Sequence, residues 1–217
     1  EACLEIDRIF KAHFSEMSKL AHACALAKVP KTLEYCLETL EGEKKLAVFA
    51  HHHDVEDALV AGFEAAGIKV VRLTGEESPK QKDAAIESFQ KGDARVFLGG
   101  LKCSIGYTIT AAHRAVFAEL DWTPGVMDQA GDRLHRIGQL DSVLLTYIVL
   151  ENSLDSKKVG MLIGKRRDFR AILDDPLKDF NVPMGEPDPK EESPALSPSH
   201  VFEILKRLDI REDQVPF

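Results

Sequence analysis

The first forty residues of the chain carry apolar side chains at helical spacing. The apolar positions of the first part are Ile6, Ile9, Phe10, Phe14, Met17 and Leu20. This spacing predicts a helix over residues 5–28. Pro30 has no backbone N–H and suits the first turn of a helix, so the pattern predicts a break there. A second helix is then predicted from Pro30 to Gly42, where the glycine would end it.

Short apolar runs follow, and each is nearly continuous rather than alternating. They are rich in Val, Leu and Phe and cover residues 45–50, 69–74, 94–99, 114–120 and 143–150. Strands that are buried on both faces of a parallel sheet show this pattern. Helical patterns lie between and after them, over residues 54–67, 79–92, 125–138 and 153–173. Strand–helix alternation predicts an α/β fold with a doubly wound, mostly parallel sheet and flanking helices.

A change of composition after the last predicted helix divides the chain. The segment 181–199 is rich in proline and acidic residues and has little to bury, which predicts a linker. The pattern of residues 200–210 is compatible with a short amphipathic helix that docks on the lobe or on a protein partner. The expected organisation is a helical lead-in, an α/β lobe, a Pro/acidic linker and a short amphipathic segment, over residues 1–42, 43–175, 176–200 and 201–217.

Charge and composition narrow the possible functions. A formal net charge of −8 argues against a generally basic nucleic-acid binder but allows a local basic surface. The four cysteines have no metal-ligand spacing, which favours reduced thiols in the cytoplasm or nucleus. His51, His52 and His53 are consecutive, so a strand would point them to opposite sides, and we expect no metal site. No apolar run is long enough for a membrane span.

The chain has no recognisable site for binding a nucleoside triphosphate by itself. The nearest phosphate-loop string is "GMLIGKRR" (160–167), which has the wrong spacing and has Arg166 where Ser or Thr must reach Mg²⁺. It also lies inside a helical pattern. The segment "AELDW" (118–122) ends a predicted strand but lacks paired carboxylates. We therefore expect any triphosphate and its Mg²⁺ to be held by another domain.

The segment "DQAGDRLHRIGQ", which begins at Asp128, carries two arginines on one face of the predicted helix. Arg133 and Arg136 are three residues apart, so their guanidinium groups would point the same way. One interpretation is surface ion pairs with Asp128, Asp132 or Glu119. The other is a pair of guanidiniums aimed at a phosphoryl group that a second domain presents, where they neutralise transition-state charge.

This segment resembles motif VI of the Snf-type branch of superfamily-two helicases, whose pattern is close to QAxDRxHRIGQ. Other segments resemble that family's motifs in the same order, over residues 45–52, 71–92, 100–113 and 116–130. The strings "FAHH" and "FAELxWxPGV" most resemble the annealing-helicase (HARP-like) branch. The resemblance covers residues 28–173 and implies the second RecA-like lobe, or helicase C-terminal domain, of a DNA-dependent ATPase.

The resemblance implies roles for the residues of this segment. ATP with Mg²⁺ would bind mainly to a first RecA-like lobe of the same protein. Arg133 and Arg136 would reach its γ-phosphate, and Gln129 would help to close the cleft between the lobes. Gly106, Asp132 and His135 would also line that cleft. The intact protein is then expected to hydrolyse ATP when DNA is bound, and this lobe alone is expected to be inactive.

The resemblance also implies sequence-independent contacts to the DNA backbone, at Gly75, Ser78, Thr110 and Trp122. Glycine lets the chain approach a phosphate closely, and amides or hydroxyls can hold its oxygens. Ser78 has a second interpretation, as the N-cap of the helix with a capping box to Gln81. Trp122 either stacks on a base or packs at a strand end.

The chain departs from the family pattern at several positions. Glu76 and Glu77 follow Gly75 where small hydroxyl residues are usual, and carboxylates there would repel phosphate. Gly99–Gly100 replaces the Ser-Thr pair that opens motif V, His113 replaces its closing Asp, and Lys82 replaces an arginine. These departures favour a second hypothesis, a non-catalytic module that docks DNA or protein. Under either hypothesis, the expected location is the cytoplasm if the source is a bacterium or a phage, and the nucleus if the source is a eukaryote.

Overall fold

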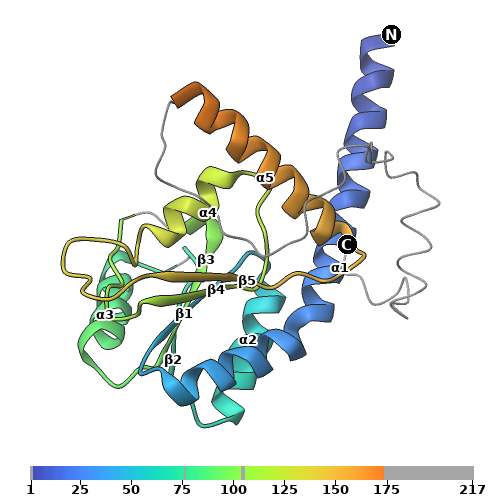
Figure 1. The fold of residues 1–217 in the computed structure, drawn as a ribbon. Helices are drawn as coiled ribbons and strands as arrows, with labels where there is room; N and C mark the ends of the chain where they lie inside the picture. Colours follow the sequence, from blue (N-terminus) through green and yellow to red (C-terminus); the bar gives the residue numbers. More distant parts are fainter. Residues whose placement is uncertain (1, 76, 104–105, 174–217) are drawn as a thin grey trace. The chain divides into compact units, whose positions relative to one another are not determined.

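The computed structural model describes residues 2–75, 77–103 and 106–173 (Figure 1). The predicted linker and the predicted C-terminal helix lie outside the described residues. The chain forms two compact units. One runs from Ala25 to Val149 and holds the whole sheet; we call it the sheet unit. The other contains the described residues up to Cys24 and those from Leu150 to Leu173, with the helix α5 (Leu154–Leu173).

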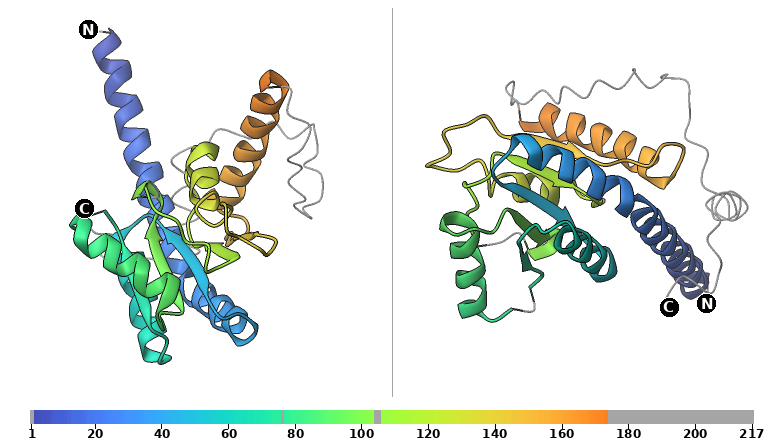
Figure 2. Two further views of the ribbon diagram at one scale, coloured as in Figure 1. Left: turned by 90° about the vertical axis from the view of Figure 1, so that its left-hand side faces the viewer. Right: turned by 90° about the horizontal axis from the view of Figure 1, so that it is seen from below.

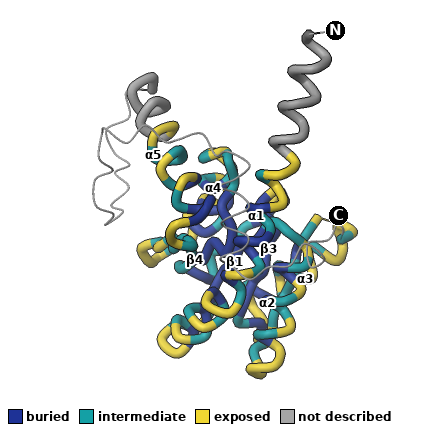
Figure 3. The backbone as a smooth tube through the Cα atoms, turned by 90° about the vertical axis from the view of Figure 1, so that its right-hand side faces the viewer, coloured by how far each residue is buried: buried dark blue, intermediate teal, exposed yellow. Residues whose placement is uncertain are grey.

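The predicted parallel α/β fold is confirmed. All strand pairings are parallel, in the order β2-β3-β1-β4-β5. The strands are β1 (Leu46–Ala50), β2 (Val70–Leu73), β3 (Val96–Gly100), β4 (Arg114–Phe117) and β5 (Leu144–Tyr147). The connections contain α2 (His53–Ala65), α3 (Pro79–Lys91), a 3₁₀ turn η1 (Leu101–Cys103) and α4 (Pro124–Gly131). The central strands β1 and β3 are buried along their whole length, and β4 is buried except at its first residue (Figure 3).

Helices cover both faces of the sheet (Figure 2). Alternate residues of a strand point to opposite faces, so Leu46 and Val48 share one face and Phe49 lies on the other. The first face packs against the second half of α1 (Ala2–Gly42) and against α2, through Cys36, Leu40, Leu59 and Phe63 among others. Aliphatic burial therefore fixes these two helices to the sheet.

The opposite face is aromatic. Phe49 stacks on Phe117 with centroids 5.1 Å apart, and Phe117 stacks on Tyr147 at 4.8 Å. Phe89 of α3 packs on Phe97 at 5.5 Å, which attaches α3 to this face. A Cβ at Gly99 would lie 2.8 Å from the ring of Phe97. The glycine that departs from the family pattern therefore has a packing reason, because the aromatic cluster leaves no room for a side chain.

The expected break at Pro30 is wrong, since α1 is one helix from Ala2 to Gly42 and passes through Pro30. A proline inside a helix costs about 3 kcal/mol because it removes a hydrogen bond and clashes with the preceding turn. The apolar stripe that packs on the sheet continues on both sides of the proline, at Ala25, Val29, Leu33, Cys36 and Leu40. Burial of this stripe outweighs the local cost.

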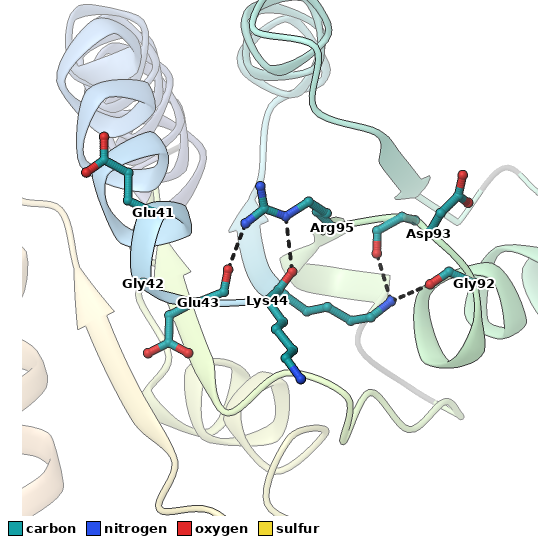
Figure 4. A pocket seen from close by; sticks show the side chains of 9 residues that line it. Glu41, Gly42, Glu43, Lys44, Gly92, Asp93 and Arg95 are labelled. Atoms are coloured by element: carbon teal, nitrogen blue, oxygen red, sulfur yellow. Dashed lines mark hydrogen bonds between the residues drawn. The ribbon is translucent and has the colours of Figure 1, made fainter.

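Two cations hold the amino edge of the sheet together (Figure 4). Lys45 Nζ donates to the carbonyls of Gly92 and Ala94, both at 2.9 Å, and to that of Phe89. Arg95 donates to the carbonyls of Leu40, Glu43 and Lys44. Each cation thus caps the carboxyl end of a helix, α3 or α1, where unpaired carbonyls and the helix dipole favour positive charge.

A pocket of about 450 Å³ lies at this edge, between the end of α1 and the loop that follows α3. Its two best-placed cations, Lys45 and Arg95, already bond to backbone carbonyls. We therefore interpret the pocket as part of the structural framework. None of the helices in the described part of the chain combines the length and apolar character that a membrane span requires.

We predict that Arg95→Met lowers the free energy of unfolding by about 1.5–3 kcal/mol, because it leaves carbonyls at the end of α1 without their charged donor. Urea unfolding followed by circular dichroism measures the change. Lys44→Met is the matched control, since Lys44 is an exposed cation of the same edge. Equal stability of the two variants would contradict the capping role of Arg95.

Candidate functional site

The predicted helix over residues 125–138 ends early, because α4 stops at Gly131. The following backbone forms tighter turns, with Leu134 N donating to the Gly131 carbonyl at 3.0 Å. The carbonyl of Arg133 accepts from Ile109 N, also at 3.0 Å, and so bonds to a distant segment instead of continuing a helix. Arg133 and Arg136 therefore do not share a helix face. They lie in successive turns.

The two arginines have different surroundings. Arg136 is exposed, and its Nη1 donates to the hydroxyl of Thr108 at 3.0 Å. Arg133 is half-buried, and its Nε is buried without a hydrogen-bond partner. Among the described residues, neither guanidinium forms an ion pair with a carboxylate. The predicted alternative of ion pairs with Asp128, Asp132 or Glu119 is wrong.

Two glutamine side chains hold the loop that supplies Thr108. Gln90, near the end of α3, donates to the carbonyl of Thr108 at 3.2 Å and to the hydroxyl of Thr110 at 3.3 Å, and accepts from Ala111 N at 2.7 Å. Gln139 donates to the carbonyls of Thr110 at 3.2 Å and Ala112 at 2.9 Å. We call residues 108–112 the clamped loop.

Of the four other predicted cleft residues, all but Gly106 lie close to the arginines along the chain. Gln129 is exposed on α4, and Asp132 and His135 are exposed in the turns that follow. Gly106 is exposed just before the clamped loop and has φ of +90°, a conformation that favours glycine. Thr110, predicted to contact DNA, instead has its hydroxyl and carbonyl bonded inside the lobe.

The predicted DNA residues Gly75 and Ser78 lie before the other end of α3. Gly75 is exposed with φ of +105°, and Ser78 is the exposed N-cap. The capping box is confirmed, because Gln81 Oε1 accepts from Ser78 N at 2.9 Å and the Ser78 side chain accepts from the backbone N–H of Gln81. Trp122 is half-buried between β4 and α4.

Glu77 has a structural partner that the sequence did not reveal. Its carboxylate accepts hydrogen bonds from Gly75 N at 2.8 Å, from Thr74 N at 2.9 Å and from the Thr74 hydroxyl at 3.0 Å. Burial alone would raise the pKa of Glu77, but these hydrogen bonds outweigh it and hold the pKa below its ordinary value. The Glu77 carboxylate thus occupies the Gly75 amide, one of the groups that the family resemblance assigns to a DNA phosphate.

A buried carboxylate at the carboxyl edge of the sheet is a second feature that sequence reasoning missed. Glu119 follows β4 and accepts from the backbone N–H groups of His51 and His52 at 2.7 and 2.9 Å, and it contacts His52 Nδ1 at 2.5 Å. Burial opposes ionisation of Glu119, yet the His52 imidazole and these amides bring its pKa below the ordinary value. Glu119 therefore joins β4 to the segment after β1.

The histidines near this carboxylate do not form a metal centre. Burial, together with the neighbouring His52 and Lys102, lowers the pKa of His51 and keeps it neutral near pH 7. His53 contacts Glu56 on α2 at 3.2 Å. Within the part of the chain that the structure describes, no group of three or more His, Cys, Asp or Glu side chains is arranged to hold a metal ion.

Comparison with known proteins agrees with this architecture. The family model described as "Helicase conserved C-terminal domain" matches residues 27–138, about half of the chain. A SWI/SNF-related matrix-associated actin-dependent regulator of chromatin subfamily A-like protein 1 from Bos taurus is 41% identical over 133 residues, 60% of this chain and 14% of that protein. The DNA annealing helicase and endonuclease ZRANB3 of Homo sapiens is 30% identical over 92% of this chain and 20% of its own length.

Solved structures support the same assignment. The Sulfolobus solfataricus SWI2/SNF2 ATPase core domain is 28% identical, with a TM-score of 0.54 over 65% of this chain and 29% of that one. The C-terminal part of the Fun30 ATPase domain shares the fold, with a TM-score of 0.58 over 61% of this chain and 44% of that one. The chain spans a fifth or less of the two curated relatives above.

The segments that resemble helicase motifs contain or follow the strands β1 to β4 of one parallel sheet. The family model covers these four strands and ends before β5. The chain therefore belongs to the family of helicase conserved C-terminal domains, as a RecA-like lobe of the SNF2 type with annealing helicases among its relatives.

Proposed function

We propose that this lobe is the second half of an ATP-dependent DNA translocase and supplies Arg133 and Arg136 to ATP bound on a first lobe. The observation that carries the proposal is that neither guanidinium pairs with a carboxylate among the described residues. Arg136 has only a neutral hydroxyl partner, and Arg133 Nε has none. Uncompensated arginines near a surface suit an incoming anion.

The described residues fit a nucleotide site that is shared with a first lobe better than a site that this chain forms alone. The described residues have no cluster of carboxylates suited to a cation, so Mg²⁺ and most contacts to ATP would come from the first lobe. When bound, the nucleotide would supply the γ-phosphoryl group that is cleaved. The arginines would neutralise charge that develops on it. Gln129, Asp132, His135 and Gly106 would line the same cleft.

The DNA side of the proposal rests on the loop before α3. Gly75 and Ser78 are exposed, and Gly75 has no side chain that would keep a phosphate away from the backbone. Trp122 would add a contact outside this loop. Thr110 could add one only by donating its hydroxyl proton, because its hydroxyl and carbonyl oxygens already accept hydrogen bonds inside the lobe. Opening and closing of the two lobes would move the protein along the backbone without reading sequence. The proposed setting is a nucleus or a cytoplasm that contains the DNA.

We predict that Arg136→Ala lowers kcat for ATP by about 10³-fold, the lower end of the range for an arginine finger. ATP turnover is measured with and without forked DNA, with this lobe joined to its first lobe. ATP binding should change little because the first lobe dominates it. The control is Lys31→Ala, which removes an exposed cation on α1 whose ion-pair partner is Glu34 of the same helix.

Two outcomes would contradict the proposal. Equal losses of ATP binding and turnover in Arg136→Ala would show that the arginine binds the ground state rather than the transition state. A folded pair of lobes without DNA-stimulated turnover would favour the alternative, a non-catalytic module that docks DNA or protein. The chain alone is expected to hydrolyse no ATP in either case.

We further predict that Glu77→Gln strengthens binding to duplex DNA by roughly threefold to tenfold at low salt. The change removes a negative charge and weakens the internal anion that competes for the Gly75 amide. Fluorescence anisotropy at two salt concentrations measures the affinity and its salt dependence. Glu64→Gln, an equal charge change at an exposed position of α2, is the control. Identical affinities would mean that the loop faces away from DNA.

A further inference from the structure

We propose that Thr108 and Gln90 are positioning residues for Arg136. The inference rests on the proposed function and extends it, because it names the residues that hold the guanidinium of Arg136 in position. Thr108 contacts the guanidinium directly, and Gln90 fixes the backbone that carries Thr108. Neither side chain needs to touch the nucleotide. Both would act through the arginine.

The hydrogen-bond partner of the Arg136 guanidinium is the neutral hydroxyl of Thr108. A hydroxyl at 3.0 Å orients the guanidinium but leaves its positive charge uncompensated. A carboxylate in the same place would bind Arg136 more tightly and reduce its attraction for a phosphoryl group. Thr108 thus holds the arginine in place while it remains available to an anion. Arg136 as a whole residue is exposed, and its guanidinium has no second hydrogen-bond or ion-pair partner among the described residues.

Gln90 is bonded in a way that only an uncharged amide satisfies. Its nitrogen donates to Thr108 and Thr110, while its oxygen accepts from Ala111 N. A glutamate would keep the last bond but place an oxygen against the Thr108 carbonyl. Gln139 bonds the same loop through the Thr110 and Ala112 carbonyls. The clamped loop is therefore fixed from α3 and from the segment that carries Arg136.

The position of Gln90 on α3 links the two halves of the proposed site. The helix begins at Pro79, directly after Ser78 and the loop proposed to meet DNA, and Gln90 lies in its last turn. Thirteen helical residues extend about 20 Å. Because α3 is one continuous helix, we expect a displacement at its start to be carried to Gln90, and from there to Thr108 and Arg136. This connection from the DNA-side loop to Arg136 would determine how strongly DNA stimulates ATP turnover.

The first test compares Thr108→Val with Thr108→Ser in the two-lobe protein. Valine has the shape of threonine but no hydroxyl, so we expect kcat to fall about tenfold, with KM for ATP changed less than about twofold, the scale of one hydrogen bond to a charged group. Serine keeps the hydroxyl and should restore turnover to within about twofold. Equal turnover of the two variants would overturn the role of Thr108.

The second test replaces Gln90 by Met, which removes its hydrogen bonds at similar length. We expect stimulation by forked DNA to fall about fivefold or more, while turnover without DNA changes less. Glu87→Gln, an exposed change one turn earlier on α3, is the control. Unchanged stimulation in Gln90→Met, or the same loss in Glu87→Gln, would overturn the role of Gln90.

A third measurement separates this inference from the proposed function. The guanidinium signals of Arg136 are recorded by ¹³C and ¹⁵N NMR in the 217-residue chain with labelled arginine, and are assigned with Arg136→Ala. Thr108→Val and Gln90→Met should shift them, and Thr108→Ser should not. If wild-type turnover is absent but the shifts appear, the proposed function fails and the positioning stands. Absence of the shifts overturns the positioning whatever the turnover.

Discussion

Burial of β1 between β3 and β4 is the constraint on which the sheet unit depends. All five residues of this strand are fully buried, so both of its faces must be covered. Aliphatic side chains on one face hold the second half of α1 and α2, and phenylalanines on the other hold α3. This double cover carries α1 through Pro30 and excludes a side chain at Gly99. At Pro30 the packing of α1 on the sheet outweighs the tendency of proline to break a helix. At Gly99 the packing of the aromatic rings excludes the hydroxyl side chain that is usual in motif V.

Polar side chains in this lobe serve mainly to satisfy backbone groups. Lys45 and Arg95 bond carbonyls at the amino edge, Gln90 and Gln139 bond the clamped loop, and Glu77 bonds amides before α3. A buried or half-buried backbone group without a partner is costly, so such bonds are strongly favoured. The arginines of the motif VI segment differ from these residues. No carboxylate among the described residues pairs with their guanidinium groups. The function we propose rests on that contrast, because an anion from another lobe could bind them.

The departures from the family pattern have unequal meanings. Gly99 is explained by the aromatic cluster, and His113 contacts Glu43 at 3.2 Å beside the ion pair of Glu43 with Arg114. These two changes belong to the framework of the lobe. Glu77 is different, because it places an internal anion on a loop that resembles a phosphate contact. It bears on how tightly DNA is held rather than on whether the lobe folds.

The sequence by itself determined the strand order along the chain, the parallel α/β class, the capping box at Ser78 and the family, because apolar periodicity and contiguous motifs are local signals. It did not determine where α4 ends, that α1 continues through Pro30, or which groups meet Arg136, Glu77 and Glu119. Gln90 and Thr108 are 18 positions apart, and Glu119 and His52 are 67 apart. Only tertiary structure decides such pairs, because hydrogen bonds between distant segments form only once the sheet has brought them together.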